Sequence, residues 1–454
     1  MTSFIQVLTT VLVIAIAARL IIKKHNPVAV FLAIGIITLT IYSFVTGTSL
    51  VEASTGNLFF DVLKFVEEKM KSSTQGLGLI LMTVTGYAVY MSHTGAATKL
   101  ALTATKPLSK LNNPYIVLSF VFIIGTILKL VITSHSGLGL LMMATCFPIL
   151  IQLGVGKVSA AATMTLVGFL DWGPNDSSAI FAAKISEMEP VQYFLTYQAK
   201  VSICCILAMA VFLPIYFRKK DKEDKASNLD GIKVENLEMP DLPVIYIILP
   251  AIPLLLVSIF AFIPNINMGI ISANLIGFVV TFILEIIRRK DIKAVGEDMP
   301  VILKAMGTCF ANIVSIIISA GVFAKSIIVL NGVSVLGDFL AGLGGGVIIS
   351  MILMSLITFG AVMLLGSGNA SWYAFGPLVP NIAAEMGIST AVIAVPMQLA
   401  TAIGRSLSPV AGVVIAVSGL AEIDSIDMIK RCVVPMLVSF AVCIISSYIF
   451  VVLL

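Results

Sequence analysis

Long apolar runs dominate this sequence and leave few folds open to it. In the first half they lie near residues 4–22, 28–45, 75–93, 115–132, 159–183 and 191–217. In the second half they lie near residues 243–262, 268–287, 307–330, 346–365, 389–417 and 432–454. A helix needs about 20 mostly apolar residues to cross a bilayer, where its backbone must bond within its own segment. The runs therefore predict an all-α polytopic membrane protein that is embedded in the lipid bilayer.

Composition agrees with this class of protein. Only 11% of the 454 residues are charged and 59% are hydrophobic, whereas soluble domains carry about 25% charged residues. The net charge of +4 is small and the chain has no basic tail, so we expect no nucleic-acid partner. We interpret Phe4–Ile22 as a first membrane helix, because no basic segment precedes it and no small-residue cleavage site follows. The six cysteines lack metal-ligand spacing, so we expect no metal site.

One hydrophilic segment, residues 218–242, divides the chain. It contains RKKDKEDK and separates a predicted N-terminal repeat, 1–217, from a C-terminal repeat, 243–454. Two amphipathic segments, Phe59–Lys71 and Ile292–Lys304, suit helices lying in the membrane interface or ordinary solvated connectors. The basic loops near residues 19–24 and 288–293 fall on opposite faces if every run spans, so the membrane sidedness stays open.

Each half contains a short apolar piece that starts with polar residues and is followed by a broken apolar run. The predicted hairpins cover about 133–156 and 366–387, and the predicted broken helices cover about 159–183 and 389–417. The breaks fall at DWGPNDSS (171–178) and GRSLSP (404–409). Ser134 and Ser367 are 367−134 = 233 positions apart. Paired re-entrant hairpins and broken helices predict two inverted repeats that meet at the binding site of a secondary transporter.

The start of a half-helix offers free backbone N–H groups and a positive dipole end, which favour a carboxylate. The candidate substrate-binding residues at the hairpin tips are Thr133, Ser134, His135, Ser136, Ser367, Gly368, Asn369 and Ser371. The candidates at the broken helices are Asn175, Arg405, Ser406 and Ser408. Arg405 can give a carboxylate two parallel hydrogen bonds. Alternatively, the tip residues are helix caps, and Arg405 pairs with Asp171 or Asp176 or reaches to the interface.

Asp171 and Asp176 are the candidate ion-coupling residues, with three interpretations. They bind Na⁺ together with Asn175 and unwound backbone carbonyls, one of them carries a coupled proton, or they neutralise Arg405. No cofactor other than this coupling ion is expected. The chain has no HExxH, P-loop or CxxC motif, and the adjacent pair Ser134–His135 does not make a nucleophile and base. We therefore predict that the protein is not an enzyme, and paired broken helices suit alternating access better than an open channel.

Three stretches resemble the C4-dicarboxylate uptake C (DcuC) family of the ion-transporter superfamily. They are GSGNASWYAFGPLVPNIAAEMGI (366–388), GRSLSPVAGVVIAVSGLAEI (404–423) and, more loosely, GLGLILMTVTGYAVYMSHTGA (76–96). The first-half motif DWGPNDSS departs from the family pattern at Asp171. The resemblance implies a multi-pass carrier of the bacterial inner membrane for succinate, fumarate or malate. It also implies a homodimer in which a transport domain moves as an elevator.

Two functions of the same class follow. The first is symport or exchange of small C4-dicarboxylates. The hairpin tips would bind the carboxylates, Arg405 or His135 would supply positive charge, and the first-half aspartates would take part in cation coupling. The second is an ion-coupled carrier for another carboxylated solute, such as an amino acid or a peptide-like compound. Asp171 and Asp176 would then pair with the amine of the substrate.

Overall fold

The computed structural model describes residues 2–23, 25–224, 239–261, 263, 266, 268–331 and 346–453. All elements in these ranges are helices. Six of them are long and apolar enough to cross a membrane, and their bounds are Pro27–Thr46, Pro190–Glu223, Ile270–Arg289, Ile292–Val329, Gly346–Leu365 and Ser425–Leu453. Shorter apolar helices cover Leu8–Ile21, Pro114–Leu128 and Val244–Phe260. The prediction of an all-α membrane protein is confirmed.

Local sequence explains where several helices start and stop. In α2 (Pro27–Thr46), the Asn26 side chain accepts hydrogen bonds from two backbone N–H groups of the first turn, and Gly47 ends the helix in the left-handed conformation. In α6 (Pro114–Leu128), Asn113 caps the start in the same way. Asparagine before proline at the first helical position, with glycine after the last turn, is a favoured pattern for both helix ends. These caps fix both ends of α2 and the start of α6.

Two long helices, one in each half, run through a π-helical turn at their middle. Helix α3 (Leu58–Ser73) continues through η1 (Thr74–Gly78) into α4 (Leu79–His93). Helix α16 (Met299–Cys309) continues through η6 (Phe310–Val314) into α17 (Ser315–Val329). The amphipathic segment Phe59–Lys71 is thus the first half of a longer helix rather than a separate one. The corresponding segment Ile292–Lys304 is divided between α15 (Ile292–Gly296) and the start of α16.

The two halves share an order of short helices. The first half has α7 (His135–Thr145), α8 (Phe147–Gln152), α9 (Lys157–Leu166) and α10 (Ser177–Ile185). The second half has α20 (Gly368–Phe375), η7 (Gly376–Leu378), α21 (Val379–Glu385), α22 (Thr390–Arg405) and α23 (Gly412–Leu420). Non-helical backbone separates α9 from α10 and α22 from α23. Each half therefore presents a helical hairpin followed by an interrupted helix.

The remaining helices complete the fold. They are α1 (Thr2–Ile22), α5 (Ala96–Thr105), η2 (Lys106–Lys110), α11 (Pro190–Tyr193), η3 (Phe194–Gln198), α12 (Ala199–Glu223), η4 (Val244–Ile247), η5 (Leu249–Ala251), α13 (Ile252–Phe260), α14 (Ile270–Arg289), α19 (Gly346–Leu365), α24 (Ser425–Ser447) and η8 (Tyr448–Leu453). Helix α12 extends six residues past the predicted boundary at 217, and residues 225–238 of the predicted linker lie outside the described ranges. The run near 243–262 begins with 3₁₀ turns, and prolines at 243, 250 and 253 lack the N–H that a regular helix needs.

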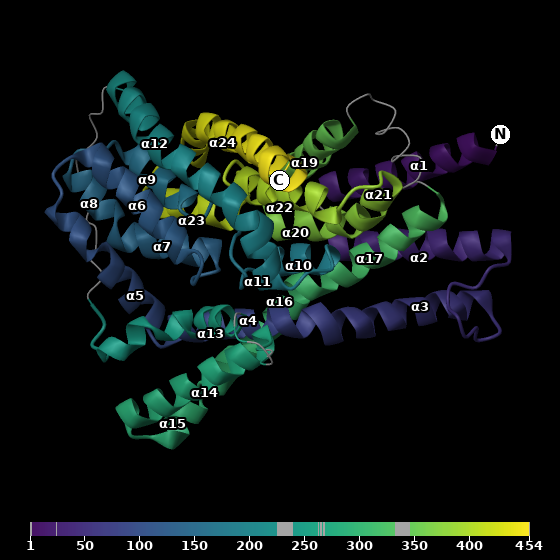
Figure 1. The fold of residues 1–454 in the computed structure, drawn as a ribbon, viewed down its shortest axis with the longest axis horizontal. Helices are drawn as coiled ribbons and strands as arrows, with labels where there is room; N and C mark the ends of the chain where they lie inside the picture. Colours follow the sequence, from purple (N-terminus) through teal and green to yellow (C-terminus); the bar gives the residue numbers. More distant parts are fainter. Residues whose placement is uncertain are drawn as a thin grey trace.

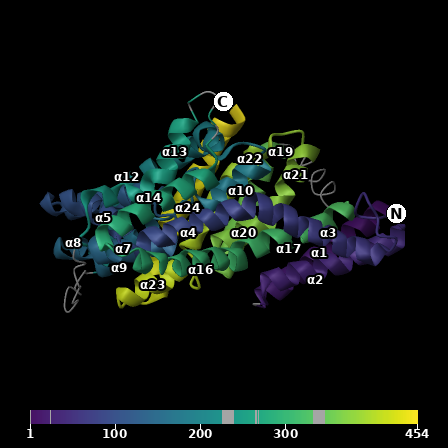
Figure 2. The ribbon, with the colours of Figure 1, turned by 90° about the horizontal axis from the view of Figure 1, so that it is seen from below.

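The interrupted helices lie inside the molecule. Helices α1, α2 and α3 form one end and α5, α8 and α9 form the other, with α10, α20 and α22 between them (Figure 1). Helix α22 packs against α19, α20 and α24, while α23 packs against α7 and α9. From below, α4 crosses the middle of the molecule beside α16 (Figure 2). Elements far apart in the sequence therefore meet at the centre, where α22 is buried along nearly its whole length.

Candidate functional site

A cavity of about 360 Å³ lies where the hairpins and the interrupted helices of both halves meet. Its lining residues are Thr133, Ser134, His135, Ser136, Asp171, Asp176, Ser177, Gly366, Ser367, Gly368, Asn369, Arg405, Gly412 and Val413. Ten of the fourteen predicted site residues are in this set. Two segments of each half contribute to it, so neither half forms the cavity alone.

The starts of two helices face the cavity. At the start of α7, the Ser134 hydroxyl accepts a hydrogen bond from the Gly137 N–H at 3.1 Å. At the start of α20, the Ser367 hydroxyl accepts one from the Ala370 N–H at 3.2 Å. Each serine satisfies one of the N–H groups that lack an intrahelical acceptor at a helix start. The serines thus serve as caps, and the preceding N–H groups of each first turn stay available to an anion in the cavity.

Arg405 ends α22 and reaches across to the unwound segment of the first half. Its Nη1 lies 2.9 Å from Asp171 Oδ2 and its Nη2 lies 2.8 Å from Asp171 Oδ1. Nη2 also donates to the Gly168 carbonyl oxygen at 3.3 Å. This two-point contact is the ion pair that was one of the alternatives for Arg405. The guanidinium is still a wall of the cavity, and its buried Nε has no partner among the described residues.

Lys129 follows the last residue of α6 and was missed by sequence reasoning. Its ammonium lies 3.1 Å from Asp171 Oδ1 and 2.9 Å from Asp176 Oδ2, and it donates to the Thr133 carbonyl oxygen at 2.7 Å. The lysine is fully buried. A lysine within an apolar run was the available signal, because a charge at membrane depth is costly unless it is paired. Two cations and two carboxylates therefore form one buried cluster without net charge.

His135 joins its hairpin to the neighbouring interrupted helix. Its Nε2 lies 2.8 Å from the Thr165 carbonyl oxygen. Since a carbonyl oxygen only accepts, Nε2 carries the proton and Nδ1 of the neutral ring is an acceptor. Nδ1 is buried and has no partner among the described residues. A Cβ added at Gly168 would lie 2.3 Å from this imidazole, so the glycine is required for the close approach of the ring.

Four predicted site residues lie outside the cavity. The Ser371 hydroxyl donates to the Thr358 carbonyl oxygen at 3.0 Å, and the Ser408 hydroxyl donates to the Met363 carbonyl oxygen at 2.8 Å. Both serines thus tie their segments to α19. Ser406 is fully buried. Asn175 lines a separate void of about 10 Å³ beside Thr133, so it does not face the same space as the aspartates.

Two glutamines hold the unwound backbone of the first half. Gln198 accepts a hydrogen bond from the Gly173 N–H at 3.0 Å and donates to the Gln398 side-chain oxygen at 2.8 Å. Gln398 donates in turn to the Asp171 carbonyl oxygen at 2.5 Å and to the Ser178 hydroxyl at 2.7 Å. Sequence reasoning missed this pair. The signal was an amide within each of two apolar runs, because an amide buried there needs partners.

Asp176, at the end of the unwound segment, contacts the start of α10 as well as Lys129. Asp176 caps α10, and its Oδ1 accepts from the Ser178 N–H and hydroxyl, both at 2.9 Å. Its Oδ2 contacts Lys129, as described above. One carboxylate therefore joins the start of α10 to the end of α6. This double role makes Asp176 a rigid wall of the cavity.

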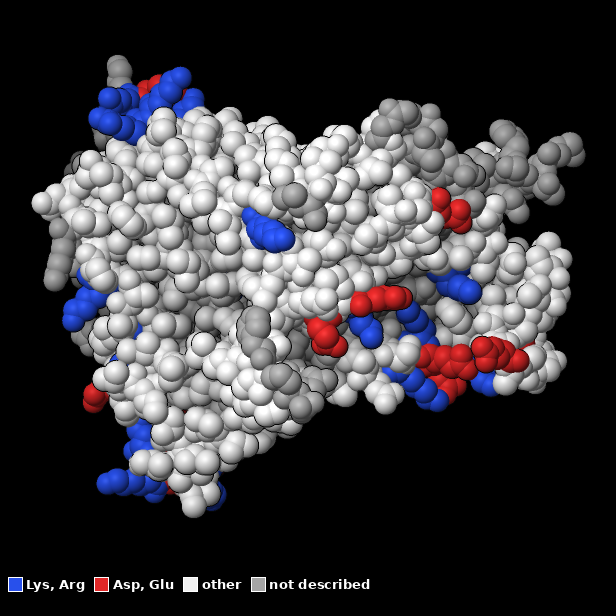
Figure 3. Space-filling view, in the orientation of Figure 1, with Lys and Arg blue, Asp and Glu red and all other residues white. Residues whose placement is uncertain are grey.

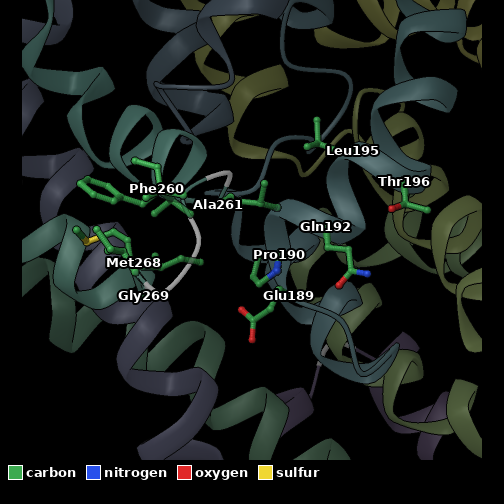
Figure 4. Close-up of a pocket in the computed structure, with 14 residues that line it drawn as sticks. Glu189, Pro190, Gln192, Leu195, Thr196, Phe260, Ala261, Met268 and Gly269 are labelled. Atoms are coloured by element: carbon green, nitrogen blue, oxygen red, sulfur yellow. The ribbon is translucent and has the colours of Figure 1, made fainter.

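A second cavity, of about 580 Å³, lies between residues 189–196 and residues 257–270 (Figure 4). Its polar lining groups include Glu189, Gln192 and Thr196, and its described lining residues contain no lysine or arginine. Most of the other walls are apolar. A carboxylate would meet the like charge of Glu189 without a cation there, so the smaller cavity with Arg405 is the better candidate for an anionic ligand.

The hairpin tip of the second half gives a prediction about its backbone. Gly366 has φ +72°, and an added Cβ would lie 2.8 Å from the Val410 carbonyl oxygen. Gly387, at the other end of this hairpin, has φ +65° and nothing within 4 Å of an added Cβ. Holding a residue that has a Cβ in the left-handed conformation costs about 1–2 kcal/mol at either position. We expect Gly366→Ala to displace the tip and abolish ligand binding to the purified protein, while Gly387→Ala binds normally. Equal binding by the two variants would contradict this prediction.

Comparisons with known proteins identify the family. A model of the C4-dicarboxylate anaerobic carrier family, DcuC, matches residues 5–452. The chain belongs to the DcuC family. It is 33% identical to the anaerobic C4-dicarboxylate transporter DcuC of Escherichia coli O6:H1, over 98% of this chain and 97% of the relative. It is 30% identical to the probable anaerobic C4-dicarboxylate transporter DcuC of Vibrio cholerae, over 95% of both chains.

Solved structures show that this DcuC-family chain has a known transporter fold. Neisseria gonorrhoeae MtrF, described as illuminating a class of antimetabolite efflux pumps, superposes with a TM-score of 0.65 at 16% identity, over 93% of this chain and 95% of MtrF. The Alcanivorax borkumensis YdaH transporter superposes with a TM-score of 0.59 at 14% identity, over 94% and 98%. The resemblance to the DcuC family is confirmed. The chain is a multi-pass protein of the bacterial inner membrane, and its relatives are named as transporters, not as enzymes.

Proposed function

We propose that this protein is a secondary active carrier of small C4-dicarboxylates such as succinate, fumarate or malate. One observation carries the proposal: two helix starts, one from each half, line the same cavity as an arginine. Two helix starts offer backbone N–H groups to two separate carboxylates. The names of the DcuC relatives support the same class of substrate.

Arg405 has the central role in this proposal. Its guanidinium is bound to the Asp171 carboxylate in the structure. A carboxylate of the substrate presents the same geometry to a guanidinium as an aspartate does. We propose that the substrate takes one face of Arg405, with the unpartnered Nε as a further donor. Thr133, Ser134, Ser136, Ser367, Gly368 and Asn369 surround the rest of the ligand in this proposal.

The charges of the cluster bear on the coupling mechanism. The Lys129 ammonium already contacts the three oxygens of Asp171, Asp176 and Thr133 that a sodium ion between these residues would use. We therefore propose exchange or proton-coupled symport at this cluster in place of the sodium interpretation. We further propose that the halves are inverted repeats, which is supported by their matching helix order. An elevator movement within a homodimer is also proposed, and it rests on the family resemblance alone.

The alternative substrate, a solute with an amine, is less well supported. Asp171 contacts both Arg405 and Lys129, and Asp176 contacts Lys129. Neither carboxylate is free to pair with the amine of an amino acid unless one of these cations leaves. A carrier for such a solute would need at least one aspartate facing the cavity without a cation beside it. This arrangement favours a dicarboxylate.

Uptake into proteoliposomes tests the proposal. Purified protein is reconstituted with internal succinate, and entry of labelled succinate is measured with fumarate, malate, aspartate or a monocarboxylate as competitor. The assay is run in sodium buffer and in choline buffer. We expect competition by fumarate and malate, little effect of a monocarboxylate, and equal rates in the two buffers.

Each outcome of this assay has a defined meaning. Competition by aspartate alone would favour the amine-bearing solute, and no succinate entry would contradict the proposed function. A rate that rises with sodium in a saturable manner would contradict the assignment of Lys129 as the resident cation. Liposomes with protein but without internal succinate separate exchange from net symport, because an obligate exchanger takes up no label in them.

A further inference from the structure

A groove of about 840 Å³ lies on the outer surface between α6 and α12, away from the cavity described above. Its apolar lining residues are Ile116, Phe120, Ile123, Pro214 and Ile215, and Asn113, Tyr115 and Ser119 add polar groups to the walls. Three cations, Arg218, Lys219 and Lys222, lie at the end of the groove on α12. The groove is therefore mostly apolar and has a basic end.

The outer face of α12 marks the edge of the bilayer at this groove. Leu207, Val211 and Ile215 lie one helical turn apart on this face, and each is at least 60% exposed. Such a stripe on a membrane protein faces lipid. The next turn carries Arg218 and Lys219, and Figure 3 shows the basic cluster at the end of α12 in the upper left of the molecule. The change from exposed apolar to basic residues within one turn is typical of the boundary between hydrocarbon and headgroups.

The acidic groups near this end are already paired. Glu223 lies 2.8 Å from Lys220 and 4.0 Å from Lys219. Asp221 contacts Arg431 at 2.7 Å and accepts from the Tyr115 hydroxyl at 2.9 Å. In the described ranges no carboxylate forms an ion pair with Arg218 or Lys222. The groove end thus carries an excess of positive charge at the level where lipid phosphates lie.

We propose that this groove binds an anionic phospholipid, with the phosphate at Arg218, Lys219 and Lys222 and an acyl chain along Ile116, Phe120 and Ile215. Basic pockets between membrane helices bind anionic headgroups in this way. A soluble phosphate would make no use of the apolar walls. A second copy of the chain, placed here by a twofold axis, would bring the same three cations against each other. The combination of an apolar groove and like charges therefore favours a lipid.

The lipid would contact α12, and α12 is hydrogen-bonded to the end of the first hairpin. Asp221, on the inner side of α12, accepts a hydrogen bond from the Gly156 N–H at 3.0 Å and one from the Ser159 hydroxyl at 2.5 Å. Gly156 immediately precedes α9, at the outer end of the hairpin. A lipid held at the end of α12 would therefore also restrain this end of the hairpin.

Native mass spectrometry of the delipidated full-length protein tests this proposal. Phosphatidylglycerol and phosphatidylcholine with identical acyl chains are titrated separately. The groove variant Arg218→Gln/Lys219→Gln/Lys222→Gln is compared with the control variant Lys290→Gln/Lys293→Gln/Lys304→Gln, which removes three exposed lysines at another surface. Inorganic phosphate and glycerol 3-phosphate are tested as competitors at millimolar concentration.

We expect the native protein and the control variant to bind the first phosphatidylglycerol at least tenfold more tightly than phosphatidylcholine. The groove variant should lose this preference and keep its elution volume in size-exclusion chromatography. An equal loss in both variants would overturn the proposal, since it would reflect total charge and not the groove. Displacement of the lipid by inorganic phosphate at low millimolar concentration would also overturn it, as would the absence of any lipid preference in the native protein.

Discussion

Arg405→Lys is expected to weaken succinate binding by roughly one to two orders of magnitude while the protein stays folded. Lysine keeps the positive charge but offers a compact point charge in place of a planar fork with parallel donors. A hydrogen bond to a charged group contributes about 1.5–3 kcal/mol, and 1.4 kcal/mol corresponds to a factor of ten in affinity. Binding is measured by titration calorimetry of the purified protein. Transport by this variant should fall in parallel.

A double variant separates ligand binding from structural pairing. Arg405→Gln/Asp171→Asn removes both charges and keeps groups that can form a hydrogen bond across the same gap. If Arg405 serves only to neutralise Asp171, this variant should bind succinate as the native protein does. We expect it to be as stable as the native protein and to bind no succinate at concentrations that saturate the native site. Unchanged binding would contradict the proposed role of Arg405.

Lys129→Met is expected to be the most destabilising single substitution at the site. It leaves Asp176 without a cation in the described structure, and Asp171 keeps only Arg405. Removal of one partner from a buried ion pair typically costs about 3–5 kcal/mol, because the remaining charge stays buried. Thermal unfolding of the purified protein in detergent measures the effect. A decrease in melting temperature no larger than that caused by a lipid-facing substitution, such as Ile127→Ala, would contradict the cluster described here.

The matched control restores the charge balance. Asp176→Asn retains the side-chain oxygen that caps α10, so Lys129→Met/Asp176→Asn should recover most of the lost stability. The two variants also test whether the Lys129 ammonium occupies the position that a sodium ion would take. Adding sodium should stabilise Lys129→Met, where two carboxylates face a vacated position, and should leave the double variant unchanged. An identical response of both variants to sodium would mean that the ion acts elsewhere.

Much of this architecture could be predicted from the sequence, because the bilayer restricts what an apolar run can do. The run near 346–365 coincides with α19, and the polar residues Ser134 and Ser367 mark the starts of α7 and α20. The helix ends were harder to predict. Helix α12 continues to Glu223 because its polar last turns can stay helical in water. Hydropathy predicts only the part of a helix that lies in the hydrocarbon, so it could not predict this end.

The partners within the site could not be predicted. Lys129 lies within the apolar run 115–132, so the sequence marks it as a charge at membrane depth but does not show which residues it pairs with. Only the fold places it beside Asp171 and Asp176, which follow 42 and 47 positions later in the chain. The sequence likewise does not show the partners of Gln398, since its side-chain contacts are all with residues 200 or more positions away. The sequence identifies which polar groups are buried, and the tertiary fold determines which of them meet.

The division of the charged cluster between the halves has a consequence for biogenesis. Lys129, Asp171 and Asp176 leave the ribosome long before Arg405, which is 234 positions beyond Asp171. Synthesis runs from the N-terminus, so these three charges are present in the nascent chain before the arginine is. Lys129 pairs with both aspartates, so these three side chains together carry one net negative charge until Arg405 is added. The arriving second half then neutralises this charge, which provides an electrostatic reason for the two halves to assemble.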